Sequence, residues 1–111
     1  MTSMADPAEL LAVATRQEED RAVLVLDGEF DMHTAPTVAD SITEALATGP
    51  SAVEVDTADI SFIDSAGLVT LLIGQRRARA AGAELYVSRP SKPFDRVLKM
   101  TGLEDLLAHR A

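Results

Sequence analysis

The order of elements in the sequence predicts a single α/β domain built on a mixed, mostly parallel β-sheet of four to five strands. Short β-branched runs alternate with helix-patterned runs in the order β-β-α-β-α-β-α-α. Strands joined through helices take right-handed crossovers and run parallel, whereas the first two strands follow each other directly. A chain of 111 residues, 47% of them hydrophobic, has room and material for one core.

The acidic composition argues against several classes of protein. With 18 acidic and 10 basic residues the net charge is −8, which would repel nucleic-acid phosphates. The absence of cysteine removes disulfides and thiolate metal sites and fits a cytoplasmic protein. No apolar stretch approaches the roughly 20 residues that span a bilayer. We expect a soluble, cytoplasmic domain at residues 9–111 behind a flexible tail at residues 1–8, with no nucleic-acid or membrane partner.

The first two strands are expected to pair as an antiparallel hairpin. The run 9–16 could be a strand or a helix, and we expect a strand because the turn-like residues 17–20 lead into a clearer strand at residues 22–26. Asp27-Gly28 should stop this second strand, and residues 29–33 should form a loop.

An amphipathic helix is expected next. His33 or Thr34 opens it, with Pro36 in the first turn, where a missing N–H costs little. Its end is expected at Gly49-Pro50. Its apolar face is formed by Val38, Ile42, Ala45 and Leu46.

A long connection is expected after the third strand, residues 53–56. Residues 56–64 should be packed down, because Ile60 and Phe62 are too hydrophobic for a free loop. The following helix should begin near Ser65 and end before Gly82, a suitable C′ residue. Its inward residues are expected to be Leu68, Val69, Leu71, Leu72 and Ile73.

The last part of the chain is expected to add one strand and two short helices. The strand spans residues 84–88 and the first helix residues 93–100. Thr101-Gly102 should break that helix before a last helical turn or two at residues 103–108.

The loops that follow the parallel strands define the expected functional face. Sites in such sheets lie beyond the carboxyl ends of the strands. Residues 28–31, 56–65 and 88–92 should therefore approach one another at one edge of the sheet.

Ser65 has two roles that its local sequence does not separate. As a helix N-cap its oxygen would accept an orphan N–H, for about 1 kcal/mol of stability. It could also be a phosphoacceptor, or both, and Asp64 beside it could cap the helix or orient the hydroxyl. A catalytic serine is not expected, because a nucleophile elbow needs Gly-x-Ser-x-Gly and Ile63 occupies the first glycine position.

No metal, cofactor or catalytic centre is expected. Asp31-x-His33 offers two ligands without a third at a suitable spacing, so a polar loop is the better interpretation. The sequence has no Gly-x-Gly-x-x-Gly or P-loop pattern. These absences favour a protein-binding domain over an enzyme.

Three motifs give the chain a resemblance to a known family. They are Gly28-Glu29-Phe30-Asp31 followed by His33-Thr34, the run from Asp59 to Leu68 that contains Asp64-Ser65-Ala66-Gly67, and Met100-Thr101-Gly102-Leu103. Over residues 10–108 the chain resembles the anti-sigma factor antagonists of the STAS domain class. The resemblance implies a small α/β layer with a mixed sheet and helices packed mainly on one face.

The resemblance also implies partner switching. An unmodified antagonist of that family binds an anti-sigma factor that is also a serine kinase, which frees a sigma factor. Phosphorylation of the serine that matches Ser65 separates the two proteins, and a serine phosphatase resets the cycle. The residues expected at the partner surface are Asp31, His33, Thr34, Asp64, Ser65, Ala66 and Gly67.

The chain departs from the family pattern at one position, and a second function is also possible for a STAS domain. Many members carry a second hydroxyl residue after the acceptor, whereas this chain has Ala66, which leaves Ser65 as the only hydroxyl in the tip. The alternative is a STAS accessory or scaffold subunit of a lipid-transport, anion-transport or stress-sensing complex.

Overall fold

The structure, a computed structural model, describes residues 10–107. The expected tail at residues 1–8 and the last residue of the expected C-terminal turn, Ala108, lie outside the described residues. The elements in chain order are β1 (Leu11–Glu18), β2 (Arg21–Phe30), α2 (Ala35–Ala47), β3 (Ala52–Ile63), α3 (Ser65–Ala80), β4 (Glu84–Ser88), α4 (Lys92–Thr101) and α5 (Glu104–Leu107).

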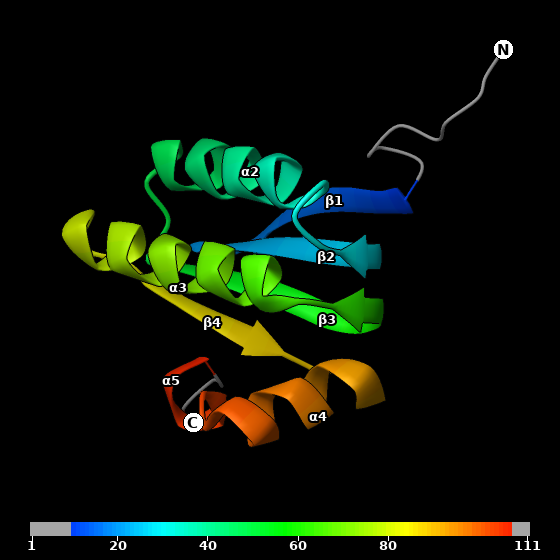
Figure 1. Cartoon of the computed structure of the whole chain (residues 1–111). Helices are drawn as coiled ribbons and strands as arrows, with labels where there is room; N and C mark the ends of the chain where they lie inside the picture. The colour runs from blue at the N-terminus through cyan, green and yellow to red at the C-terminus, as the bar shows by residue number, and fades with distance from the viewer. Residues whose placement is uncertain (1–9, 108–111) are drawn as a thin grey trace, which may run out of the picture.

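The four strands form one mixed sheet in the order β1-β2-β3-β4 (Figure 1). β1 and β2 pair antiparallel, as the expected hairpin, and β2-β3 and β3-β4 pair parallel. The parallel pairs are joined through α2 and α3, as strands of the same direction require. The predicted fold class is therefore confirmed.

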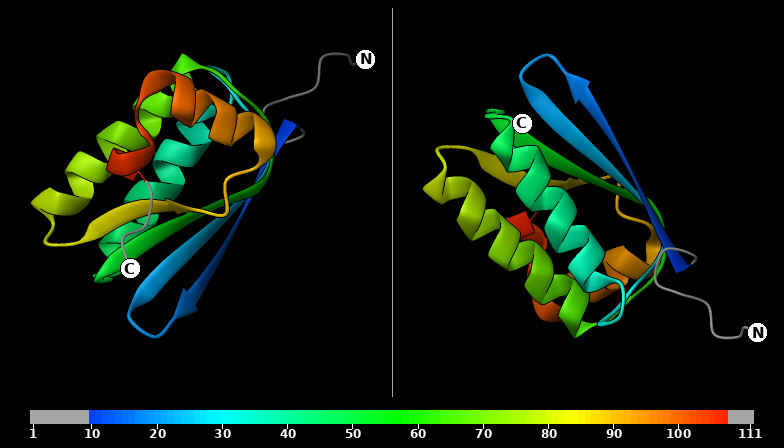
Figure 2. Two further views of the ribbon diagram at one scale, coloured as in Figure 1. Left: turned by 90° about the horizontal axis from the view of Figure 1, so that it is seen from below. Right: turned by 90° about the horizontal axis from the view of Figure 1, so that it is seen from above.

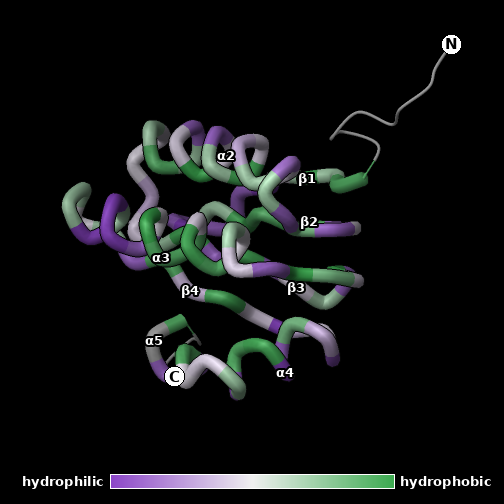
Figure 3. Tube along the Cα trace, viewed as in Figure 1, coloured by the Kyte–Doolittle hydropathy of each residue, from purple (hydrophilic) through white to green (hydrophobic). Residues whose placement is uncertain are grey.

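The helices lie on one face of the sheet (Figure 2). α2 and α3 run side by side there, and α3 is mainly hydrophobic in its first half and hydrophilic toward its C-terminal end (Figure 3). Their buried side chains meet those of the central strands, where Leu24, Phe30 and Val55 are fully enclosed. β3 continues past the end of β4, and α4 packs beside this continuation with Phe94 and Leu98 inward.

Two strands are longer than the sequence pattern predicts. Asp27-Gly28 does not stop β2, which continues to Phe30, and the expected connection at residues 56–64 is mostly strand, because β3 reaches Ile63. The parallel pairing of these strands contains two register shifts, between Val25 and Asp27 and between Gly28 and Glu29. Such irregularities let a strand pass residues that interrupt the alternation of buried and exposed side chains.

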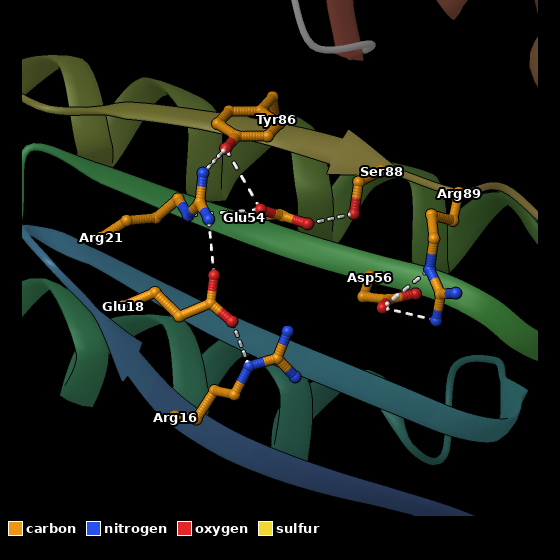
Figure 4. Close-up of polar contacts among 8 residues, drawn as sticks. All are labelled: Arg16, Glu18, Arg21, Glu54, Asp56, Tyr86, Ser88 and Arg89. Atoms are coloured by element: carbon orange, nitrogen blue, oxygen red, sulfur yellow. Dashed lines mark hydrogen bonds and ion pairs between the residues drawn. The ribbon is translucent and has the colours of Figure 1, made fainter.

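The face of the sheet without helices carries a polar network (Figure 4). Arg21 of β2 donates to Glu18 at 2.6 Å and to the Tyr86 hydroxyl at 3.4 Å. Glu54 of β3 accepts from Ser88 at 2.7 Å. Hydrogen bonds from Arg16 and Arg21 lower the pKa of Glu18. Because these charges are paired within the domain, this face can meet water without a covering helix.

Tyr86 provides a test of this network. Burial of its hydroxyl raises the pKa of Tyr86, although Arg21 opposes the shift. Because the unfolded chain loses this proton at lower pH, the free energy of unfolding should fall as pH rises above about 10. Tyr86 is the only tyrosine, so phenolate absorbance reports it directly in folded and denatured protein. Tyr86→Phe should reduce the alkaline slope of stability; coincident titrations in the two states would contradict the prediction.

Candidate functional site

The start of α3 lies against the carboxyl end of β2. The Asp64 N–H donates to the Phe30 carbonyl oxygen at 3.2 Å, which ties the turn before α3 to the last residue of β2. Asp64 has an extended backbone, and its Oδ1 accepts from the Gly67 N–H at 3.1 Å. Asp64 is therefore the N-cap of α3.

The expectation that Ser65 caps the helix is wrong. Ser65 is the first helical residue, and its side chain is exposed. An N-cap needs a non-helical backbone, which Asp64 supplies. The Ser65 hydroxyl makes no hydrogen bond within the part of the chain that the structure describes. It is therefore accessible and not engaged in holding the helix.

Asp64 also holds the loop between β2 and α2. Its second oxygen, Oδ2, accepts from the Met32 N–H at 3.3 Å. Asp31 organises the same loop, because its Oδ1 accepts from the His33 N–H at 2.9 Å and the Thr34 N–H at 3.1 Å. The Asp31–His33 loop and the start of α3 are thus joined through one carboxylate.

Thr34 and Gly67 have structural places within this arrangement. Thr34 is buried, and its hydroxyl donates to the Glu29 carbonyl at 2.8 Å. This bond stabilises the loop between β2 and α2. A Cβ on Gly67 would lie 2.9 Å from the Phe30 carbonyl oxygen and 2.9 Å from Ile63 Cγ1. The absence of a side chain at Gly67 lets the first turn of α3 sit directly on the ends of β2 and β3.

Exposed apolar side chains lie along α3 and on the segments next to its start. Val69 and Ile73, which we expected to point inward, are 51% and 46% exposed, whereas Leu68 and Leu71 are buried. Met32 in the loop bonded to Asp64 is 66% exposed, and Phe62 near the end of β3 is 49% exposed. We call these four side chains, with Ser65, the α3 face. Exposed apolar side chains gathered in this way are typical of a protein-binding surface.

The third expected segment, residues 88–92, does not reach Ser65. Because β4 ends at Ser88, this segment lies beside the middle of β3, where the Ser91 N–H donates to the Thr57 carbonyl at 3.2 Å. Arg89 there binds the buried Asp56 carboxylate with Nη2 at 2.9 Å (Figure 4). The expectation that all three loops meet is therefore correct only for the first two.

The described part of the chain contains neither a cluster of metal ligands nor a helix that could span a membrane. Within residues 10–107 no group of three or more His, Cys, Asp or Glu side chains is arranged to hold a metal ion. The Asp31 carboxylate is used in its own loop, where it accepts backbone N–H groups. None of the helices described is both long and apolar enough to cross a membrane.

Asp64 gives a second testable prediction. Asp64→Ala removes both of its hydrogen bonds and should lower the free energy of unfolding by roughly 1–2 kcal/mol. Ser91→Ala is the matched control, because Ser91 caps α4 by accepting from the Phe94 N–H at 3.3 Å. Denaturant unfolding should show losses of similar size for both variants. An unchanged stability of Asp64→Ala would mean that its two bonds do not hold the turn.

The fold and the site define a small α/β domain that presents an exposed serine at the start of a helix. The sequence matches the family described as "Mlab, STAS domain" over residues 13–108. The anti-sigma-B factor antagonist of Staphylococcus epidermidis is 30% identical over 98 residues, which cover 87% of this chain and 90% of that protein. The chain belongs to the STAS domain family, and its sequence relatives include the anti-sigma-B factor antagonists of Staphylococcus epidermidis and Staphylococcus aureus.

Solved structures agree on the fold. The anti-sigma factor antagonist SpoIIAA in its unphosphorylated form has a TM-score of 0.74 at 22% identity, covering 90% of this chain and 89% of that one. The phosphorylated form of Bacillus SpoIIAA has a TM-score of 0.67 at 22% identity, covering 90% and 92%.

Proposed function

We propose that the chain is an anti-sigma factor antagonist whose α3 face binds an anti-sigma factor with serine kinase activity. Binding of the unphosphorylated form frees a sigma factor, and phosphorylation of Ser65 ends the binding. One observation carries the proposal: the Ser65 hydroxyl is exposed and unbonded at the start of a helix that carries the exposed apolar side chains Val69 and Ile73. The names of the sequence relatives support the same role.

The proposed contact residues divide by their exposure. Met32, His33, Ser65 and Val69 are exposed and would touch the partner. Asp31, Thr34 and Gly67 fix the loop and the first helical turn through the contacts described above, and Asp64 joins the two. Ala66 is partly exposed beside Ser65.

The proposed phosphorylation needs nothing from this chain except an accessible hydroxyl. The Ser65 oxygen attacks the γ-phosphorus of ATP bound to the kinase, the bond to ADP breaks with its electron pair on ADP, and a base of the kinase takes the serine proton. A serine phosphatase would restore the hydroxyl by hydrolysis. The chain itself acts as a binding protein and not as an enzyme, as the names of its relatives suggest, and it would work in the cytoplasm with its sigma factor.

The test uses the anti-sigma factors with a serine-kinase ATP-binding domain that are encoded in the same genome. Each is purified with its sigma factor and titrated with the unmodified chain, and release of the sigma factor is measured. With radiolabelled ATP, one of them should phosphorylate the wild-type chain on Ser65 and leave Ser65→Ala unlabelled. Failure of every such factor to bind the unmodified chain would overturn the proposal.

An accessory role in a transport or sensing complex is the second candidate. One observation favours it: the matched family is described by the name Mlab and not by that of an antagonist. Purification of the tagged chain from its own cells separates the two roles. Recovery with a membrane complex, without any kinase-type anti-sigma factor, would favour the accessory role.

A further inference from the structure

A hollow lies between α2 and α3 and shares Ile73 with the α3 face. It is lined by Ala39 and Ile42 from α2 and by Thr70, Ile73, Gly74 and Arg77 from α3, and its volume is about 120 Å³. An apolar cavity of roughly 150 Å³ holds a molecule as large as benzene. The hollow therefore has space for one aliphatic side chain.

Small residues on both helices account for the hollow. A Cβ on Gly74 would lie 2.9 Å from Ile42 Cδ1 and 3.2 Å from Leu85 Cδ1, so α3 approaches α2 and the sheet closely at this residue. Ala39 and Thr70 are too short to fill the space between the helices beside this contact. Ile73 stands at the rim, nearly half exposed. The hollow is therefore bounded by the close contact at Gly74 and left open by the short side chains of Ala39 and Thr70.

The hollow continues the α3 face. Ser65, Val69 and Ile73 follow one another at a spacing of four residues, so they form one stripe along α3. Ile73 lies about 12 Å along the helix from Ser65, at 1.5 Å rise per residue. A protein partner covers roughly 800 Å² of each surface. A partner seated on Ser65 and Val69 would reach the hollow as well.

The positive charge of Arg77, at the end of the hollow farthest from Ser65, favours an acidic residue of the partner. Arg77 Nη1 donates to Thr43 Oγ1 of α2 at 3.2 Å, which holds its guanidinium across the two helices. Arg76, Arg77 and Arg79 are exposed and, among the residues described, make no ion pair with a carboxylate. In a chain of net charge −8, Arg77 thus brings a positive charge to the edge of the hollow. A guanidinium binds a carboxylate through two parallel hydrogen bonds.

We propose that the hollow is a second contact of the α3 face and takes one aliphatic side chain of the anti-sigma factor, flanked by a carboxylate that pairs with Arg77. The proposal rests on the proposed function, because the occupant belongs to the partner that binds Ser65. It adds a contact that does not depend on the phosphorylation state of Ser65 and that contributes to the choice of anti-sigma factor.

The first test titrates variants with the anti-sigma factor that binds the wild-type chain. Ala39→Leu fills the hollow and Arg77→Glu reverses its charge; each should raise Kd about tenfold or more, the loss expected for a central anchor contact. Arg96→Glu makes the same charge change on α4, and Met100→Asp replaces an exposed methionine there; both should bind like the wild type. Melting curves identify any variant that is unfolded.

The second test needs no partner. N-acetylleucinate combines an aliphatic side chain with a carboxylate, and N-acetylglycinate lacks the side chain. The leucine compound should shift the methyl signals of Ile42 and Ile73 in NMR spectra, with saturation at millimolar concentration, and the glycine compound should not. Ala39→Leu should abolish the shifts.

The outcomes separate the two proposals. If wild-type protein binds an anti-sigma factor and Ala39→Leu, although folded, binds equally well, the second contact is overturned while the proposed function stands. Absence of methyl shifts with N-acetylleucinate overturns the hollow as an aliphatic site in the same way. If no anti-sigma factor binds the wild type, the proposed function fails, and the occupant proposed here fails with it.

Discussion

Phosphorylation of Ser65 is expected to weaken binding to the anti-sigma factor by about 100-fold or more, and Ser65→Asp by about tenfold or more. A phosphoryl group adds roughly −1.5 to −2 charges, together with bulk. The exposed side chains Val69 and Ile73, which follow Ser65 along α3, are apolar, and the charged residue beside Ser65 is Asp64. A partner that covers this surface would have to bury the new charge without an opposite charge on this chain.

The same change should leave the fold intact. Ser65 is exposed and occupies the first position of α3, where the partial positive charge of the helix terminus favours an anion by roughly 0.3–1 kcal/mol. Circular dichroism of Ser65→Asp should match the wild type, and its melting temperature should be equal or slightly higher. A large loss of stability would mean that the switch acts on the fold and not on the partner surface.

Two control variants isolate the effect of position. Ser65→Ala removes the hydroxyl without adding charge and should bind within about twofold of the wild type, since surface substitutions away from specific contacts are nearly neutral. Ser51→Asp makes the same charge change just before β3, at the opposite end of the strand from Ser65. It should also bind normally. Isothermal titration compares the affinities of all five proteins: equal affinity of the unmodified and phosphorylated chains would exclude partner switching at Ser65.

Elements bounded by strong local signals could be predicted from the sequence. The strand at residues 84–88 is found as expected, because a β-branched and aromatic run there lies between Gly82 and Pro90. α2 ends at Ala47, just before Gly49-Pro50, as predicted. Gly82 has a positive φ of 79° and follows the C-cap of α3, which is the conformation expected at a C′ position. Each of these boundaries depends only on neighbouring residues.

The extents of β2 and β3 could not be predicted because they depend on pairing between distant residues. Asp27-Gly28 has the composition of a turn, yet Gly28 lies opposite Leu11 in β1 and Ile60 in β3. The bonds offered by two neighbouring strands outweigh the local preference for a turn. The consequence for the site is direct, since these extra residues carry β2 and β3 up to the Asp31 loop and to Asp64.

The exposed stripe on α3 was missed for a different reason. Five of the six residues from Leu68 to Ile73 are apolar, so hydrophobicity alone does not say which of them face the sheet. Helical spacing could have predicted their exposure, because Val69 and Ile73 follow Ser65 at intervals of four residues and so lie on the same side of the helix. A row that begins at an exposed serine and continues through exposed aliphatic residues indicates a surface.

Gly28→Ala is expected to lower the free energy of unfolding by about 3 kcal/mol or more, the largest stability loss among the variants proposed. Gly28 has a φ of 129°, which side-chain-bearing residues rarely adopt, and a Cβ there would lie 2.0 Å from the Leu10 carbonyl oxygen. The backbone strain and the steric clash both act where β1 pairs with β2, two residues before β2 ends at Phe30. Denaturant unfolding followed by circular dichroism measures the loss.

Gly49→Ala is the comparison variant, because it has backbone strain without a steric clash. Gly49 also has a positive φ, 76°, but a Cβ there would meet nothing within 4 Å. Its substitution should cost only the backbone term, about 1–2 kcal/mol. The difference between the two variants measures the close approach of β1 to β2 at Gly28 together with the extra backbone strain of a φ of 129°. If the losses are equal, the Leu10 carbonyl moves aside at no cost, and β1 does not constrain the end of β2 that positions Asp31 and Met32 beside Ser65.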